Sequence, residues 1–313
     1  MSTYLVPVTI NELDSILNIQ QHCYSGAFLE SRESFAEKLS ISRHCLGLTN
    51  NGELIAYAIA LPWTHLKELK LNSVGASESP STDCLYIHDI AVLPRYRGNG
   101  FAELLMRRLA KHACLAGLSW IDLVAVQDSS PRWARMGFVS SDLSVGSYGV
   151  DSTAMTLPIR KSVNQFTYRA ATSPDYPKIL QLVKNIEAIE VSNEVRFYEP
   201  TELLDFIEDS DWIVGVAVDS SDEIVGFSTL HRMSWHWSLL DNFLVHPNKR
   251  RLGVGRDLYA WNELILGLWR TRYITTLVDP KDNVARSFLE LRGWKSEKQY
   301  LWIDFHREGT GSR

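Results

Sequence analysis

The 313-residue sequence has few of the features that mark secreted, membrane-spanning or metal-bound proteins. Its longest apolar run, 54–63, is far shorter than the roughly 20 residues that cross a bilayer. The N-terminus lacks the basic start and long apolar core of a signal peptide. Only four cysteines occur, and no two form a Cys-x-x-Cys pair: Cys23, Cys45, Cys84 and Cys114. We therefore expect a cytoplasmic protein with buried thiols, no membrane partner and no metal site.

The sequence also lacks an excess of positive charge. Its net charge is −5, which argues against a nucleic-acid partner, because proteins that bind nucleic acids usually carry a basic surface. The composition, 45% hydrophobic and 22% charged, is ordinary for a globular protein. The length suits two domains of about 150 residues each.

One short segment occurs twice. Residues 92–102 read V-L-P-R-Y-R-G-N-G-F-A, and residues 245–255 read V-H-P-N-K-R-R-L-G-V-G. Their shared positions are separated by a constant 153 residues (245 minus 92), close to half the chain. The matched pairs are Val92 and Val245, Arg97 and Arg250, and Gly100 and Gly253. Such a repeat predicts two domains with one fold, residues 1–162 and 163–313.

Each copy follows an apolar strand-like run and opens a helix-like run. These strands are expected at 85–92 and 235–245, and the helices at 100–117 and 253–269. Each half also shows an early hairpin and, after the loop, a strand, a short helix and a final strand. This order predicts an α/β fold in which each domain is a central mixed β-sheet flanked by helices.

Three local signals give sharper expectations. Asn11 is a plausible N-cap for a first helix that runs to about residue 21. Asn50-Asn51-Gly52, between two apolar runs, predicts a tight hairpin turn. A strand at 300–305 is expected to close the second sheet.

The repeated loop has the form R-x-x-G-x-G/A. Glycine lets the backbone approach a ligand closely, and successive amides at the start of a helix form a site for an anion. The leading arginine adds positive charge, so a pyrophosphate group is the natural ligand. The pattern is neither a Walker loop nor the dinucleotide fingerprint G-x-G-x-x-G. The alternative is that the glycines only make a tight turn between strand and helix.

The loop, the Val-x-Pro before it and the Gly-aromatic pair after the next helix resemble the GNAT superfamily of N-acetyltransferases, here in a tandem two-domain form. The resemblance implies acetyl-CoA as the cofactor and a small-molecule amine, or another exposed amino group, as the acceptor. In that family the loop binds the pyrophosphate of acetyl-CoA, and the preceding strand binds the pantetheine arm. The implied pyrophosphate residues are Arg97, Gly98, Asn99, Gly100, Phe101 and Ala102, with Arg250, Arg251, Leu252, Gly253, Val254 and Gly255 in the second copy. The implied pantetheine residues are Ile90, Ala91, Val92, Phe243, Leu244 and Val245, and Asn283 matches an asparagine that often contacts the cofactor.

His88 is the candidate general base. It shares a strand face with Tyr86 by the period of two, and family members that acetylate arylalkylamines carry histidine at this position. The equivalent residue in the second half is Asp241, which shares its face with Trp235 and Trp237. A carboxylate beside two indoles suits an ammonium group. The alternatives are a histidine held only for structure and tryptophans that pack in a core or a domain interface.

Neither half has the tyrosine that usually protonates the leaving thiolate in this family. That position, four residues before the Gly-aromatic pair, is Trp133 in the first half and Leu289 in the second. Tyr86, Tyr259 or water are the substitutes left open.

The resemblance leads to an acetyl-CoA-dependent acyltransferase that acetylates a primary amine by direct transfer with a general base. Three alternatives stay open. One domain is active and the other is a degenerate partner, a layout that resembles mycothiol synthase; the acceptor is a protein or peptide amino group; or the chain binds acyl-CoA without catalysis. The acceptor and the oligomeric state are not encoded in any motif.

Overall fold

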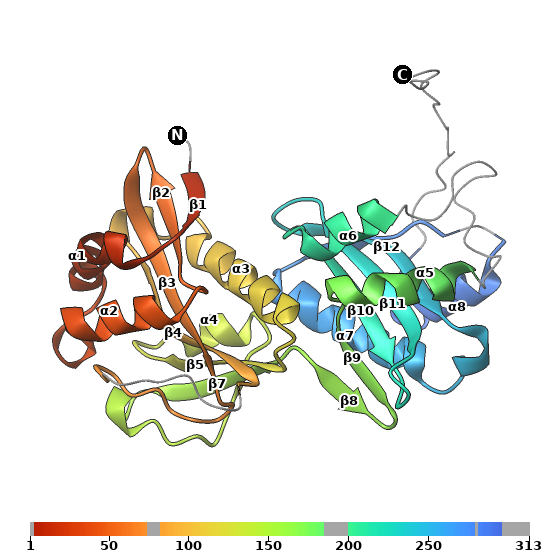
Figure 1. The fold of residues 1–313 in the computed structure, drawn as a ribbon. Coiled ribbons are helices and arrows are strands. Elements are labelled where there is room, and N and C mark those ends of the chain that lie inside the picture. Colours follow the sequence, from red (N-terminus) through yellow and green to blue (C-terminus); the bar gives the residue numbers. More distant parts are fainter. Residues whose placement is uncertain (1–2, 74–81, 185–199, 279–280, 296–313) are drawn as a thin grey trace. The chain divides into compact units, whose positions relative to one another are not determined.

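The computed structural model describes residues 3–73, 82–184, 200–278 and 281–295 (Figure 1). The chain forms two compact units, Met1–Thr275 and Thr276–Arg313, which are described separately. The first unit contains both β-sheets. No helix within the described ranges is long and apolar enough to cross a membrane.

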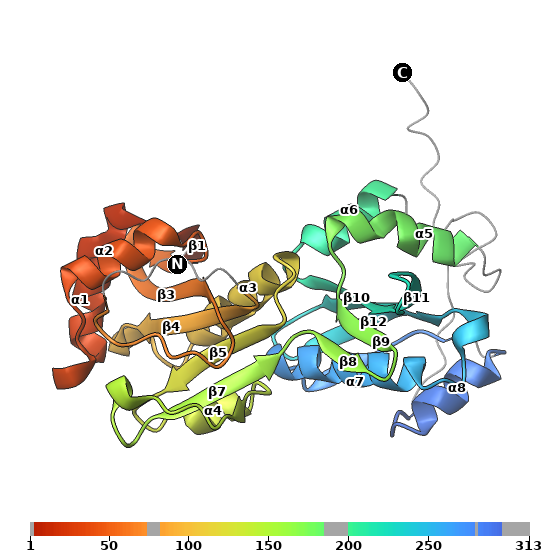
Figure 2. The same cartoon turned by 60° about the horizontal axis from the view of Figure 1, so that its bottom comes forward.

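The first half of the chain forms a seven-stranded sheet in the order β1-β2-β3-β4-β5-β7-β6. β4 and β5 are parallel and the other neighbours are antiparallel, so the sheet is mixed. Helices α1 and α2 lie side by side (Figures 1 and 2). The strands are β1 (Thr3–Pro7), β2 (Leu46–Asn50), β3 (Glu53–Trp63), β4 (Cys84–Val92), β5 (Trp120–Ala125), β6 (Val139–Ser140) and β7 (Thr153–Pro158). The α-helices are α1 (Leu13–Cys23), α2 (Arg32–Ile41), α3 (Phe101–Leu115) and α4 (Ser130–Ala134).

The second half forms a six-stranded sheet in the order β13-β12-β11-β10-β9-β8, in which only β12 and β13 are parallel. The strands are β8 (Lys161–Val163), β9 (Phe166–Ala170), β10 (Trp212–Val218), β11 (Ile224–Arg232), β12 (Trp237–Val245) and β13 (Tyr273–Thr275). The α-helices are α5 (Tyr176–Lys184), α6 (Pro200–Glu208) and α7 (Val254–Leu268), with α8 (Asn283–Glu290) in the second compact unit. Short 3₁₀ helices are η1 (Ile10–Glu12), η2 (Gly26–Phe28), η3 (Pro94–Tyr96), η4 (Gly146–Tyr148), η5 (Ser173–Asp175) and η6 (Pro247–Lys249).

Each sheet carries its own apolar core. In the first, β3 is buried from residue 54 to 61 because α1, α2 and α3 all contact it. This explains why β3 reads as a continuous apolar run with no alternation. In the second, a cluster that includes Ile179, Val216 and Phe227 packs α5 and α6 onto β10 and β11.

The structure confirms the predicted fold class, two mixed sheets flanked by helices. The hairpin at residues 50–52 is also confirmed. Asn51 and Gly52 have φ values of 51° and 82°, and two left-handed residues make a turn whose twist matches the strands. The sheets divide between Pro158 and Lys161, next to the predicted domain boundary, which itself stays a prediction.

The predicted cap of the first helix is wrong. Thr9, not Asn11, begins this segment: its hydroxyl accepts from the Asn11 amide at 3.2 Å, and Glu12 Oε2 accepts from the Thr9 amide at 2.7 Å. This capping box nucleates η1, which leads directly into α1. β8 and α6 were not predicted, and the strand expected at 300–305 lies outside the described residues.

Candidate active site

The first copy of the repeat forms a tight loop between β4 and α3. β4 ends at Val92, and α3 begins at Phe101 after η3. Gly98 and Gly100 have φ values of 82° and 75°, in the left-handed region that favours glycine. Gly100 is the N-cap of α3 and offers no side chain to cap it. The carboxylate of Glu103, in the first turn, accepts from its own backbone amide, so the amides before Glu103 are the ones that could meet an anion.

The second copy adopts the same conformation. Gly253, with φ of 88°, precedes α7. The backbone of Arg250 has φ −66° and ψ 157°, against φ −65° and ψ 157° for Arg97. Each arginine donates from Nε to the carbonyl of the last residue of the preceding strand, at 3.2 Å in both copies. One difference is that Arg251 (φ 63°) replaces Gly98, at about 1–2 kcal/mol of left-handed strain.

β4 and β5 separate beside the first loop. Their parallel pairing ends at Ile87, and within the described residues β4 continues to Val92 without a strand partner on that edge. The carbonyl oxygen of Val92 accepts from the Cys23 thiol at 3.3 Å, and that of Ile90 lies 3.3 Å from the Tyr24 hydroxyl, whose proton is directed to Asp89. This open edge is where an extended ligand could add to the sheet.

Both β4 and β12 contain a bulge at the predicted base position. The register between β3 and β4 skips one residue, His88. The register between β11 and β12 skips Asp241 in the same way. A bulge redirects a side chain, and bulges are common next to active sites. The bulge residues His88 and Asp241 therefore occupy equivalent positions in the two halves, but one carries an imidazole and the other a carboxylate.

His88 belongs to a buried ionic cluster that the sequence did not reveal. Its Nε2 lies 2.5 Å from Oε1 of Glu30, and Glu30 Oε2 accepts from Lys38 Nζ at 2.9 Å. All three side chains are at most 3% exposed. Burial alone raises the pKa of Glu30, but the charges of His88 and Lys38 outweigh burial and hold this pKa well below its usual range. Glu30 is therefore a carboxylate at neutral pH.

Two tyrosines cover the other side of the His88 ring. The Tyr148 hydroxyl lies 3.3 Å from His88 Nδ1 and 2.8 Å from the carbonyl oxygen of Leu69, to which it donates. Burial raises the pKa of Tyr148 well above its ordinary value. The Tyr86 hydroxyl lies 3.5 Å from that of Tyr148, so Tyr86 and His88 do share a face. Tyr86 is only 1% exposed and is not among the described residues that line the cavity.

Asp89, next to the bulge, is held by two tyrosines. The hydroxyls of Tyr24 and Tyr57 each donate to one of its carboxylate oxygens at 2.5 Å. Burial raises the pKa of Asp89, and the two hydrogen bonds partly offset that rise. Tyr24 follows α1 and Tyr57 lies on β3, so the hydrogen bonds of Asp89 connect the segment after α1 to strand β3.

One cavity of about 310 Å³ joins the loop to the His88 cluster. Its lining includes Arg97 and Gly100 of the loop together with Glu30, His88 and Tyr148 of the cluster. Of the predicted cofactor residues in this half, 90–92, 97–98 and 100–102 line the cavity. Asn99 does not, and its side-chain amide donates to the Tyr96 carbonyl at 3.0 Å. Trp133, at the position of the missing acid, also lines the cavity and donates to Ser129 Oγ at 3.3 Å.

The equivalent site of the second half is different. Asp241 Oδ2 accepts from the side-chain amide of Asn242 at 2.8 Å, and burial raises the Asp241 pKa. Trp235 and Trp237 are 54% and 41% exposed, so they do not pack in a core. The Trp235 ring lies against Gly100 and Arg107 of the first half, which supports the alternative of packing at a domain interface. The other predicted residues of this half, Phe243, Leu244 and Val245, end β12, and 250–255 form the loop and the start of α7. Asn283 begins α8 in the second compact unit.

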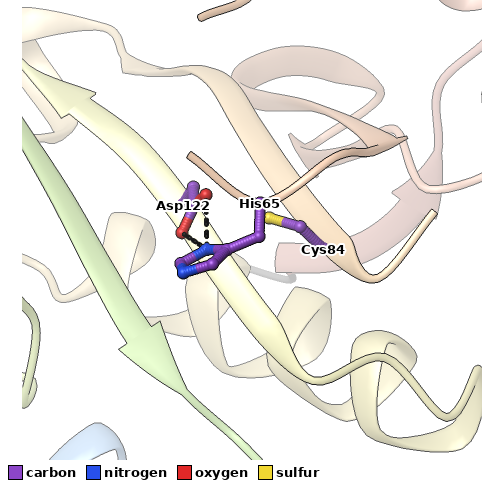
Figure 3. A group of neighbouring side chains, drawn as sticks. All are labelled: His65, Cys84 and Asp122. Atoms are coloured by element: carbon purple, nitrogen blue, oxygen red, sulfur yellow. Dashed lines mark hydrogen bonds and ion pairs between the residues drawn. The ribbon is translucent and has the colours of Figure 1, made fainter. Parts of the chain in front are cut away.

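A separate group lies at the start of β4 and β5. One ligand atom each of His65, Cys84 and Asp122 lies within 4.8 Å of the others (Figure 3). His65 Nδ1 is 3.0 Å from Asp122 Oδ2, which also accepts from the Leu66 amide at 2.9 Å, and Oδ1 accepts from Thr156 at 2.6 Å. Burial beside Asp122 raises the pKa of the Cys84 thiol far above its ordinary value. Protein donors thus already satisfy this carboxylate, and these contacts describe a structural network around a buried acid.

Comparison with known proteins places this geometry in a family. A sequence model of the acetyltransferase (GNAT) family matches residues 13–138 and again 180–294. L-2,4-diaminobutyric acid acetyltransferase of Vibrio parahaemolyticus is 30% identical over 79 residues, which are 25% of this chain and 42% of that relative. The chain thus spans less than half the length of this curated relative.

Solved structures were also matched. An aminoglycoside acetyltransferase from an uncultured soil metagenomic sample is 19% identical, with a TM-score of 0.40, over 46% of this chain and 98% of that one. The ribosomal-protein-S18-alanine N-acetyltransferase of Escherichia coli is 18% identical, with a TM-score of 0.39, over 52% and 97%. Each corresponds to about one half of the chain. The two matches to the family model, one in each half, cover most of the sequence, and the chain belongs to the GNAT family of acyl-CoA-dependent acetyltransferases.

Proposed function

We propose that the first half of the chain transfers an acetyl group from acetyl-CoA to the primary amine of a small molecule. The observation that carries this proposal is the single cavity that reaches from the glycine loop to the buried His88 cluster. A binding loop alone would suit any phosphate ligand. A binding loop that shares its cavity with His88, whose buried imidazole has a carboxylate partner, suits transfer to an amine.

The binding end fits a pyrophosphate group. The amides that precede Glu103 at the start of α3 and the charge of Arg97 complement its negative charge, and the glycines allow close approach. The pantetheine arm is proposed to lie along the open edge of β4 at 90–92, with its thioester directed toward His88. Acetyl-CoA is a substrate here, since its acetyl group is consumed in the reaction.

The catalytic end fits removal of a proton from the amine nitrogen as the amide bond forms. An amine attacks a thioester only when neutral and gives up an N–H proton in the reaction, so the site needs a base. The His88 imidazole can accept this proton, and the Glu30 carboxylate at 2.5 Å orients the ring and stabilises the imidazolium that forms. The diaminobutyric acid acetyltransferase that resembles part of the chain, by its name, acts on a small amine, which supports this acceptor class.

The second half is proposed to hold acyl-CoA without catalysing transfer. Its loop has the conformation of the first, but the bulge residue is Asp241, and no imidazole stands there. Asp241 is already hydrogen-bonded by Asn242. The single-active-domain alternative therefore has more support than two equivalent sites.

Thiol release from acetyl-CoA with a library of small amines and peptides, with products identified by intact mass, tests the proposal. We expect thiol release with small primary amines. His88→Gln should lower the rate of release at least 10²-fold, and Asp241→Asn should keep it within about twofold of wild type. Unchanged turnover in His88→Gln, with loss in Asp241→Asn, would move the active site to the second half. Acetylation of peptides alone would favour a protein acceptor. CoA binding without thiol release would favour an acyl-CoA-binding regulator.

A further inference from the structure

His88 lines the cavity, but its side chain is fully buried, so the imidazole itself has no direct route to the cavity. Its exposed fraction is 0%, and both ring nitrogens are engaged. Nε2 faces Glu30 at 2.5 Å, and Nδ1 faces the Tyr148 hydroxyl at 3.3 Å. A proton that leaves an acceptor amine can reach this imidazole only through one of these two partners.

Glu30 is the poorer route. Its Oε2 accepts from Lys38 Nζ and from Ser34 Oγ, both at 2.9 Å, and from the Asn72 amide at 2.6 Å, while Oε1 faces His88. A carboxylate with four donors, one of them a buried ammonium, has little tendency to take another proton. Its function in this arrangement is to fix the ring and to balance a positive charge on it.

Tyr148 has the properties of a route. Its hydroxyl carries one proton and has two acceptors, the Leu69 carbonyl at 2.8 Å and, when His88 is neutral, Nδ1 at 3.3 Å. With neutral His88, the hydroxyl can turn toward Nδ1. With imidazolium, Nδ1–H donates to the hydroxyl, which turns to Leu69. Each protonation state of His88 thus has a complete hydrogen-bond pattern.

The loop that carries Tyr148 is fixed in place. Ser147 donates to Glu68 Oε1 from its amide at 2.9 Å and from its hydroxyl at 2.7 Å. The Leu71 amide in turn donates to Ser147 Oγ at 3.1 Å. The segment that supplies the Leu69 carbonyl and the segment that supplies the hydroxyl are therefore joined, which holds the relay geometry.

We propose that the Tyr148 hydroxyl is the proton relay between the cavity and His88, and that it serves both the attacking amine and the leaving thiolate. The acceptor enters as a neutral amine, its ammonium proton having been lost to water, and its N–H proton passes to the Tyr148 oxygen as the Tyr148 proton passes to His88 Nδ1. The new C–N bond forms, the C–S bond breaks, and its electron pair stays on sulfur. The proton on Nδ1 then returns through Tyr148 to the sulfur, so the net change is one proton moved from amine to thiol.

This assignment rests on the proposed function and resolves its main difficulty. Trp133 and Leu289 cannot donate a proton at the usual acid position, but one hydroxyl that works in both directions needs no second acid. The raised pKa of Tyr148, caused by its burial, keeps the hydroxyl protonated at neutral pH and so ready to donate. Direct contact or one bridging water can complete the path to the substrates.

A double-mutant cycle tests the relay. Tyr148→Phe and His88→Gln are each expected to lower kcat about 10²-fold, and the double variant should be no slower than the slower single variant, because both remove one path. The Kd for CoA should stay within about twofold. The matched control is Tyr168→Phe, which removes a buried hydroxyl that has no hydrogen-bond partner among the described residues and should leave kcat unchanged.

Two outcomes overturn the relay while the proposed function stands: Tyr148→Phe within about twofold of wild-type kcat, or losses that multiply in the double variant. An absence of wild-type turnover with every amine would instead reject the proposed function. If Tyr148→Phe does not fold, a proton inventory of the wild-type enzyme in mixtures of H₂O and D₂O decides. A curved dependence of kcat on deuterium content supports two protons in flight, and a linear dependence contradicts the relay.

Discussion

At the scale of single residues, Lys38 offers a test of the buried cluster. It is 1% exposed at its side chain and pairs with Glu30, so its removal leaves a carboxylate beside His88 with much less compensation. We expect Lys38→Met to lower the free energy of unfolding by about 3 kcal/mol, and Glu30→Gln in the same chain to recover part of this loss. Urea denaturation measures both. Lys178→Met, which removes an exposed ion pair with Asp222, should change stability little.

A second residue-scale prediction concerns pH. Burial, and then the charge of His112, lower the pKa of His44 from its ordinary 6.5 to about 4. Between these values the unfolded chain binds more protons than the folded one, so stability falls as pH falls through this window. We expect wild type to lose stability between pH 7 and 5 in urea titrations, and His44→Gln to lose less. Glu30 affects stability in a different pH range. Because its pKa is lowered in the folded protein, the stability it contributes is lost only as the pH falls below its ordinary value of 4.5.

At the scale of elements, the sequence predicted best what depends on neighbours along the chain. The turn at Asn51 and Gly52 and both strand-loop-helix units need only local conformational preferences and apolar periodicity. The bulge at His88 was not predictable, because it depends on the register with β3, a strand far away in sequence. Glu30 precedes α2 and Tyr148 ends η4, in segments without a motif, and only the fold brings them to His88.

The loop itself gives a matched pair of glycine variants. Gly98 and Gly117 both have left-handed φ, 82° and 70°, and an added Cβ at either meets no described atom within 4 Å. Alanine should therefore destabilise the protein by about 1 kcal/mol at both sites through backbone strain alone. Only Gly98→Ala changes the loop that is proposed to bind pyrophosphate, so only it should weaken CoA binding, by about tenfold in calorimetry. Equal CoA affinities in the two variants would argue against this role for the loop.

At the scale of the whole molecule, the repeat predicted two related sheets, and the family matches in each half agree with it. Duplication preserves what backbone geometry requires: Arg97 and Arg250 adopt the same torsions, and each base position is a bulge. Side chains are not constrained in this way. His88 and Asp241 therefore differ although the backbone around them has the same conformation. For this reason the number of loops does not predict the number of active sites.

The stoichiometry of CoA binding tests this separation of binding from catalysis. If both loops hold CoA, calorimetry should give two sites per chain, and Gly100→Asp and Gly253→Asp should each remove one, because a carboxylate at the helix start repels pyrophosphate. Gly100→Asn and Gly253→Asn are the controls, because asparagine has nearly the shape of aspartate and tolerates left-handed φ but is uncharged. An added Cβ lies 2.7 Å from the Trp235 ring at Gly100 and 3.1 Å from the Arg256 guanidinium at Gly253, so the two variants at each site share this steric cost and a loss confined to aspartate reports the charge. Turnover should be lost only in Gly100→Asp. If the wild type binds CoA at one site only and Gly100→Asp removes it, the second loop has the shape of a CoA site but no affinity for CoA. If both aspartate variants lose turnover equally, the proposal of a single active half is contradicted.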